Sequence, residues 1–178
     1  MGIDANTRSL AFTVYWNRRP VKWGKINFEG ADVFERMHDA ALKIRAVRDE
    51  LEADYIAFES AILAKVANAD VTIKLAMVYG VCIAELMHDG TEVVTVKPLE
   101  WESFIGVPNL TKIEKEKIKT EFPGKSASWY STKGREIRKQ RIIDYANNKW
   151  DFWDTTDSDV CDSHGIAEFA YKRLTTRG

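Results

Sequence analysis

Four acidic residues stand at positions where an isolated carboxylate is hard to explain. Asp4 lies at the head of the apolar run GIDANTRSLAFTVYW, and Glu59 lies at the end of the apolar segment DYIAFES. Asp159 and Asp162 are three residues apart in TTDSDVCDSHG, a spacing that places both on one face of a helix. A buried carboxylate is costly unless it is paired or binds a metal ion. Carboxylates that converge without basic partners repel one another, and hard divalent cations relieve that repulsion.

Each of these carboxylates also has an ordinary explanation. Acidic residues are frequent at strand ends and helix starts, and Asp159 in a first helical turn favours the helix dipole. Asp157 lies elsewhere on the helical wheel and is expected to cap the final helix. His164 falls away from the face of Asp159 and Asp162, so we expect it at the surface or beside the ligands. If the four acids converge, two cations held there can activate water and stabilise the leaving oxygen in phosphodiester cleavage.

The elements that must position these acids begin with three strand-like segments. They run through about Ile3, from Leu10 to Trp16 and from Val21 to Phe28, with turns at NTR and NRRP. The segment 30–53 carries apolar residues at spacings of three and four. This spacing predicts an amphipathic helix that is capped by Asp32 or entered at Gly30.

The middle of the chain alternates strands and helices. The nearly all-apolar segment 54–60 is typical of a strand buried in a parallel sheet. The segment 69–90 predicts a helix with a broad apolar circumference, able to pack on the sheet and on a second subunit. Another strand is expected at 91–98. This order predicts an α/β fold with a mixed sheet, helices on its faces, and the first and fourth strands adjacent at its centre.

The segment at about 106–150 differs from the rest in charge and reads as a basic insertion. It holds 11 Lys or Arg residues against 5 Asp or Glu residues, whereas the whole chain has a net charge of −1. Within it, 111–122 predicts a short helix, 123–134 a loop and 135–150 a further helix. A basic segment on an acidic body suits a protein that holds a polyanion near metal-binding carboxylates. A solvated charged surface is the alternative.

Length and composition favour a single globular domain over residues 1–178, large enough for a substantial core. No apolar run approaches the roughly 20 residues that span a bilayer, and no signal peptide precedes the first strand. We therefore expect a cytoplasmic protein without a membrane partner. Cys82 and Cys161 give no disulfide framework and no metal-ligand spacing, so both are expected to fill the core.

Three stretches resemble the acidic motifs of RuvC-type Holliday junction resolvases, members of the RNase H-like nuclease superfamily. They are GIDANTRSLAFTV, IAFESAILAKVANADVTIKLAMVYGVCIAEL and SDVCDSHGIAEFAY. The resemblance covers most of the chain, and a bacteriophage member of the family fits the divergence of the rest. It implies an RNase H-like fold with a mixed five-stranded sheet whose first three strands are antiparallel. It also implies a metal-dependent endodeoxyribonuclease, a homodimer that resolves four-way DNA junctions by paired symmetric nicks.

The resemblance assigns roles residue by residue. Asp4, Glu59, Asp159 and Asp162 match the four metal-binding carboxylates and would hold two Mg²⁺ ions per active site, with Mn²⁺ able to substitute. Where the family often has an aromatic wedge after the glutamate, this chain has an aliphatic tip. The expected DNA contacts are Arg8, Ile62, Leu63, Lys65, Lys74, Lys125, Lys133, Arg135 and Arg138.

Two other functions stay open from the sequence. A related RNase H-like nuclease that acts on flaps, forks or RNA–DNA hybrids would use the same four carboxylates. A branched-DNA-binding protein without turnover would have no reason to retain four repelling acids, which argues against it. The segment 108–133 either contacts DNA or is an exposed insertion that helps to pack the dimer.

Overall fold

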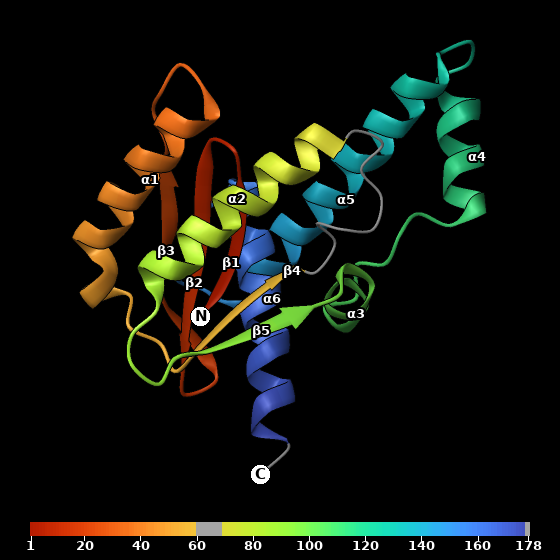
Figure 1. Cartoon of the computed structure of the whole chain (residues 1–178). Helices are drawn as coiled ribbons and strands as arrows, with labels where there is room; N and C mark the ends of the chain where they lie inside the picture. The colour runs from red at the N-terminus through yellow and green to blue at the C-terminus, as the bar shows by residue number, and fades with distance from the viewer. Residues whose placement is uncertain (60–68, 177–178) are drawn as a thin grey trace.

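A five-stranded sheet forms the centre of the computed structural model, which describes residues 1–59 and 69–176 (Figure 1). Its strands are β1 (Gly2–Asn6), β2 (Ser9–Trp16), β3 (Arg19–Asn27), β4 (Tyr55–Glu59) and β5 (Glu92–Val96). The spatial order is β3-β2-β1-β4-β5. The first three strands are antiparallel, whereas β4 pairs in parallel with β1 and β5 in parallel with β4. The predicted mixed sheet, with the first and fourth strands adjacent, is confirmed.

Helices cover both faces of this sheet. They are α1 (Val33–Val47), the short 3₁₀ helix η1 (Arg48–Glu50), α2 (Ala69–Leu86), α3 (Pro98–Phe104), α4 (Lys112–Glu121), α5 (Ala127–Lys149) and α6 (Ser158–Thr175). Among the described helices, none has the length and apolar character needed to cross a membrane.

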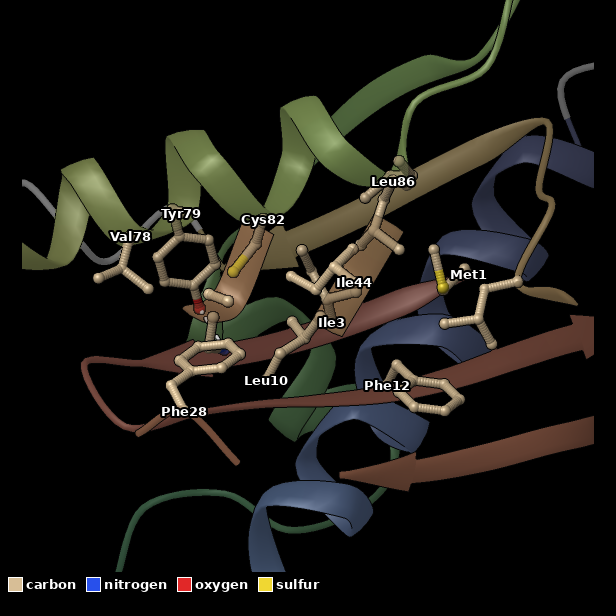
Figure 2. Close-up of a cluster of buried hydrophobic side chains, with 14 of the residues drawn as sticks. Met1, Ile3, Leu10, Phe12, Phe28, Ile44, Val78, Tyr79, Cys82 and Leu86 are labelled. Carbon is tan, nitrogen blue, oxygen red and sulfur yellow. Dashed lines mark hydrogen bonds between the residues drawn. The ribbon is translucent and has the colours of Figure 1, made fainter. Parts of the chain in front are cut away.

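The face of the sheet toward α1 and α2 is an apolar core. Ile3, Leu10 and Ile56 on the three central strands are completely buried and belong to one cluster with Ile44 of α1 and Cys82 of α2 (Figure 2). The other face packs against α6, α3 and α5, where Cys161 is also buried. Both cysteines are free and buried, as expected. Because side chains alternate along a strand, residues next to Ile3 in β1 point to the α6 face.

Side-chain caps fix where the predicted helices begin. Asp32 accepts hydrogen bonds from the backbone N–H groups of Phe34 and Glu35 at the start of α1. Asp157 accepts from the backbone N–H groups of Asp159 and Val160 at the start of α6. Each cap satisfies backbone donors that have no partner inside the helix. The capping roles predicted for Asp32 and Asp157 are confirmed.

The basic segment is more helical than predicted. The loop expected at 123–134 is wrong, because α5 already begins at Ala127, where the Ser126 hydroxyl caps it by accepting from the Trp129 N–H at 3.2 Å. The Tyr130 hydroxyl donates to the Phe122 carbonyl at 2.6 Å and ties α5 back to the end of α4. In Figure 1, α4 and the N-terminal part of α5 project from the body as a helical hairpin. We call residues 112–139 the arm.

His164 was expected either at the surface or beside the metal ligands, and the surface position is wrong. It lies within α6 and is completely buried. Its Nε2 accepts a hydrogen bond from Trp150 Nε1 at 3.3 Å, and its ring lies 4.7 Å from that of Trp153. Burial holds the pKa of His164 at about 3, so the ring is neutral.

Candidate metal centre

Three of the four predicted carboxylates meet at one end of the sheet. Asp4 on β1 and Asp159 and Asp162 on α6 each offer a carboxylate oxygen, and these oxygens lie within 4.8 Å of one another. Asp4 shares its strand face with Gly2, two residues earlier, and that face meets α6. The structure therefore brings together acids that are more than 150 residues apart in the sequence.

A close approach of α6 to the sheet makes this meeting possible. A Cβ atom added to Gly2 would lie 2.4 Å from both the Ser163 carbonyl oxygen and the Ala167 nitrogen. Real side chains do not tolerate such distances, so glycine is required here. The Thr13 hydroxyl of β2 and the Ser163 hydroxyl share a buried hydrogen bond of 2.9 Å. These contacts fix the first turns of α6 above Asp4.

Glu59 lies in the same cavity but is held apart from the three aspartates. The parallel register pairs Ile3 of β1 with Phe58 of β4, so the next step brings Asp4 level with Glu59. Glu59 Oε1 accepts a hydrogen bond from Trp101 Nε1 at 2.8 Å. Burial raises the pKa of Glu59, although the bond from Trp101 opposes the rise. Glu59 therefore lies at the wall of the site, where the hydrogen bond from the Trp101 indole orients its carboxylate.

Asp4 and Asp162 are poorly compensated carboxylates. Burial raises the pKa of Asp4 well above its ordinary value, and the charges of Asp162, Asp159 and Glu59 raise it further. Burial also raises the pKa of Asp162 to about 7. Asp162 Oδ1 is buried and has no hydrogen-bond partner among the described residues. A buried acceptor without a partner is unusual in a folded protein, which makes Asp162 Oδ1 a candidate metal ligand.

Asp159 has the opposite surroundings. Its Oδ2 accepts from Lys25 Nζ at 2.7 Å, and its Oδ1 accepts from Lys139 Nζ at 3.2 Å. Burial would raise the pKa of Asp159, but the hydrogen bonds and charges of the two lysines outweigh it and hold the pKa below its usual range. Two aspartates one helical turn apart thus differ sharply in their electrostatic surroundings.

The donor set fits a hard divalent cation. Carboxylate oxygens are the ligands that Mg²⁺ and Mn²⁺ favour, and the three converging aspartates supply them from two rigid elements. The unpartnered Oδ1 of Asp162 is an independent sign that this position takes a ligand. The geometry is that of a candidate metal centre formed by Asp4, Asp159 and Asp162, with Glu59 at its edge.

The centre opens into a cavity of about 830 Å³. All four carboxylates contribute to its lining. The arm also lines the cavity, and its basic lining residues are Lys112, Lys115, Lys119, Arg135, Arg138 and Lys139. A cavity lined by these carboxylates and by the cations of the arm suits a polyanion whose backbone is held by the arm while one phosphate reaches the acids.

Two of the predicted DNA contacts line this cavity. Arg135 is exposed, whereas Arg138 is half-buried. The Arg138 guanidinium is bonded to the buried carboxylate of Glu102 and to Asn109 Oδ1, so its structural role is to hold α5 on α3. Lys125 and Lys133 lie elsewhere on the arm. Lys125 lies over the Trp129 ring, 5.8 Å from its centroid, and Lys133 pairs with Glu136 at 3.1 Å.

The other predicted contacts lie away from the arm. Arg8 is exposed in the turn between β1 and β2, close in sequence to Asn6, which lines the cavity. Lys74 pairs with Asp70 at 2.5 Å on the surface of α2. The remaining three lie outside the described residues and stay predictions: Ile62, Leu63 and Lys65.

Sequence reasoning missed three residues that shape the centre. Lys25, Lys139 and Trp101 each bond one of the predicted carboxylates. Lys139 could have been found, because it lies one helical turn after Arg135 and so shares its face of the helix. Lys25 and Trp101 carry no local signal, since their partners are separated from them by 134 and 42 residues.

Comparisons with known proteins support the architecture. No protein-family model matches the sequence, and no curated protein matches it significantly. Among solved structures, T. thermophilus RuvC in complex with Holliday junction substrate matches with a TM-score of 0.64 and 14% identity, covering 98% of this chain and 94% of that one. A second Thermus thermophilus RuvC structure matches with a TM-score of 0.57 and 13% identity, covering 98% and 95%. The chain therefore has the RuvC-type, RNase H-like fold.

Proposed function

We propose that this protein is a metal-dependent endonuclease that resolves four-way DNA junctions by paired symmetric nicks. The observation that carries the proposal is the convergence of Asp4, Asp159 and Asp162, with an unpartnered oxygen on Asp162, in a RuvC-type fold. A structure with that fold was solved with a Holliday junction. The match extends over nearly the full length of both chains, so it includes the elements that carry the acids.

The four carboxylates have distinct positions for this task. Asp4 is fixed by the central strand, and Asp159 and Asp162 by the first turns of α6, so all three are held on rigid elements. Glu59 is oriented by Trp101 and completes the set from β4. Two Mg²⁺ ions, or Mn²⁺ in their place, would supply activation of the attacking water and stabilisation of the leaving oxygen. Hydrolysis of one phosphodiester bond then leaves a nick.

The arm supports the choice of DNA as the substrate. Its cavity-facing cations lie on two helices held together by the ion pair of Glu114 with Arg141, 2.5 Å long. Cations spaced along a helical hairpin can follow a phosphate backbone and release its counterions. This supports the view that segment 108–133 contacts DNA, rather than serving only as an exposed insertion.

Exposed residues on α2 support the homodimer. One side of α2 exposes apolar and small residues, and this stripe continues just past the end of the helix. Its members are Ile73, Ala76, Met77, Gly80, Ala84 and Met87. An exposed apolar stripe on a helix is a typical contact surface, and its small residues permit close approach of a second helix. Two copies related by a twofold axis present two metal centres, which paired symmetric nicks require.

The dimer is tested by a substitution that the monomer tolerates. A Cβ atom added to Gly80 meets no atom within 4 Å, so Gly80→Arg should fold normally. We expect it to sediment as a monomer and to lose paired nicking. Leu99→Arg, at an exposed apolar residue of α3, is the matched control and should remain dimeric. A Gly80→Arg protein that stays dimeric would remove α2 from the interface.

The activity is tested with synthetic four-way junctions and Mg²⁺. We expect symmetric nicks in opposing strands and much slower cutting of linear duplex, forks, flaps and RNA–DNA hybrids. Asp4→Asn and Glu59→Gln should abolish cutting but retain junction binding, because these carboxylates hold metal and not the DNA backbone. Equal cutting of duplex and junction would contradict structure selectivity. Tight junction binding without any metal-dependent cleavage by the wild type would identify a non-cleaving binder instead.

A further inference from the structure

Two lysines bond Asp159, but their ammonium groups have different second partners. Lys25 Nζ lies 2.7 Å from Asp159 Oδ2 and also bonds both carboxylate oxygens of Asp157, at 3.0 and 3.3 Å. Lys139 Nζ lies 3.2 Å from Asp159 Oδ1 and 2.6 Å from the Ser158 hydroxyl. Lys25 is therefore shared with the cap of α6, whereas Lys139 has only Asp159 as an anionic hydrogen-bond partner among the described residues.

The Lys139 charge also acts beyond Asp159. It lowers the pKa of both Asp4 and Asp162, against the burial that raises them. The Lys139 ammonium therefore lies close enough to act on all three converging aspartates. It also lies on the cavity wall with Arg135, one helical turn away. Its side chain is one-third exposed, so it has room to move.

We propose that Lys139 is an exchangeable counter-ion that competes with a divalent cation for Asp159 Oδ1 and, once displaced, bonds the substrate phosphate backbone in the cavity. The inference rests on the proposed function. An ammonium and a metal ion cannot both use the same oxygen without strong mutual repulsion. The flexible four-carbon stem of lysine lets the ammonium turn toward the cavity without movement of α5. Lys25, anchored by Asp157, stays in place and positions Asp159.

This exchange of Lys139 links metal binding to substrate binding through one residue. When Lys139 bonds Asp159, its positive charge partly neutralises the three converging aspartates. A cation that takes Asp159 releases Lys139 toward the cavity and adds one cation to the wall that holds the backbone. Because the coupling is reciprocal, DNA that captures Lys139 must strengthen metal binding by the same factor.

The first experiment is a calorimetric titration of the full chain with Mn²⁺ alone. We expect Lys139→Gln to bind Mn²⁺ about tenfold more tightly than wild type, because a nearby positive charge is removed. Lys139→Arg keeps the charge and should stay close to wild type. Lys25→Gln should not tighten binding, because its charge is shared with Asp157. Asp4→Asn should abolish binding in every background, which shows that the heat arises from the centre.

The second experiment measures the salt dependence of junction binding. A lysine bound to a phosphate contributes about one to the slope of log K against log salt. With Ca²⁺ present, Lys139→Gln should lower that slope by about one relative to wild type, whereas with chelator the two proteins should give the same slope. Circular dichroism of each variant checks that the fold is retained.

The outcomes separate this inference from the proposed function. If wild type binds Mn²⁺ and Asp4→Asn does not, but Lys139→Gln binds with unchanged or weaker affinity, the competition is overturned and the metal centre stands. If the slopes differ equally with Ca²⁺ and with chelator, the transfer of Lys139 to the backbone is overturned. If neither wild type nor Lys139→Gln binds Mn²⁺, the metal centre itself fails.

Discussion

Asp162 should destabilise the folded protein whenever it is ionised without a cation. Its carboxylate is buried, Oδ1 has no partner among the described residues, and Asp159, Glu59 and Glu102 add repulsion. Asp162→Asn keeps the shape and removes the charge. We therefore expect this substitution in the candidate centre to make the protein more stable at neutral and alkaline pH, in the presence of a chelator.

The magnitude follows from the pKa of Asp162, which is raised from 3.8 to about 7. Between about pH 4 and pH 7 the folded protein keeps a proton that the unfolded chain has released, so the free energy of unfolding falls as pH rises. With about 1.4 kcal/mol per pKa unit, the full loss above pH 7 is about 4 kcal/mol. A buried amide also needs partners, which costs about 1–3 kcal/mol, so a net gain of about 2 kcal/mol is expected.

Urea denaturation, followed by tryptophan fluorescence from about pH 5 to about pH 8, measures this difference. The advantage of Asp162→Asn should be largest at the alkaline end and shrink as the pH falls. Asp159→Asn is the matched control, three residues away in the same helix. It should lose stability, because Lys25 and Lys139 are left without their shared carboxylate. A loss of stability in Asp162→Asn at pH 8, or an advantage that does not vary with pH, would refute the reasoning.

Three further substitutions test the surroundings of the centre. Trp101→Phe removes the hydrogen bond that orients Glu59 and should lower kcat about tenfold or more with little change in junction affinity, measured by single-turnover cleavage and filter binding. Gly165→Ala places a Cβ atom 2.7 Å from the buried Trp101 ring. We expect it to lower the free energy of unfolding in urea by about 1–3 kcal/mol and to lower kcat about as much as Trp101→Phe does. Arg141→Met breaks the ion pair with Glu114 that joins α4 to α5, and faster amide hydrogen exchange confined to the arm is the expected readout.

The sheet and its order could be predicted because the local signals agree with the tertiary structure. Alternating apolar residues predict β2 and β3, and the all-apolar run before Glu59 predicts a buried parallel strand, as observed for β4. The start of α5 could not be predicted in the same way. Its first turns contain several polar residues and Gly134, which resemble a loop, and they are stabilised by contacts with Phe122 at the end of α4. Those contacts become visible only in three dimensions.

Only the carboxylates of the candidate centre could be predicted from the sequence. Carboxylates at a strand end and in a first helical turn are conspicuous because the pattern gives them no partner. The partners they do have are dispersed: Lys25 is on an edge strand and carries no local signal. Lys139 is on the arm, where its spacing from Arg135 indicates a shared helix face but not its partner Asp159. Periodicity predicts which face a residue lies on, but it does not predict which distant cation meets that face.

The asymmetry between Asp159 and Asp162 gives the centre an expected order of filling. Asp4 and Asp162 have few compensating charges, so a first cation that binds between them relieves repulsion at little cost. A second cation that needs Asp159 must break the bond to Lys139 and is correspondingly weaker. Mn²⁺ binding should therefore be biphasic, and the tightening expected for Lys139→Gln should appear in the weaker phase. In a nuclease, this arrangement would delay the second ion until DNA is present to accept the displaced lysine, so that metal loading becomes complete only on substrate.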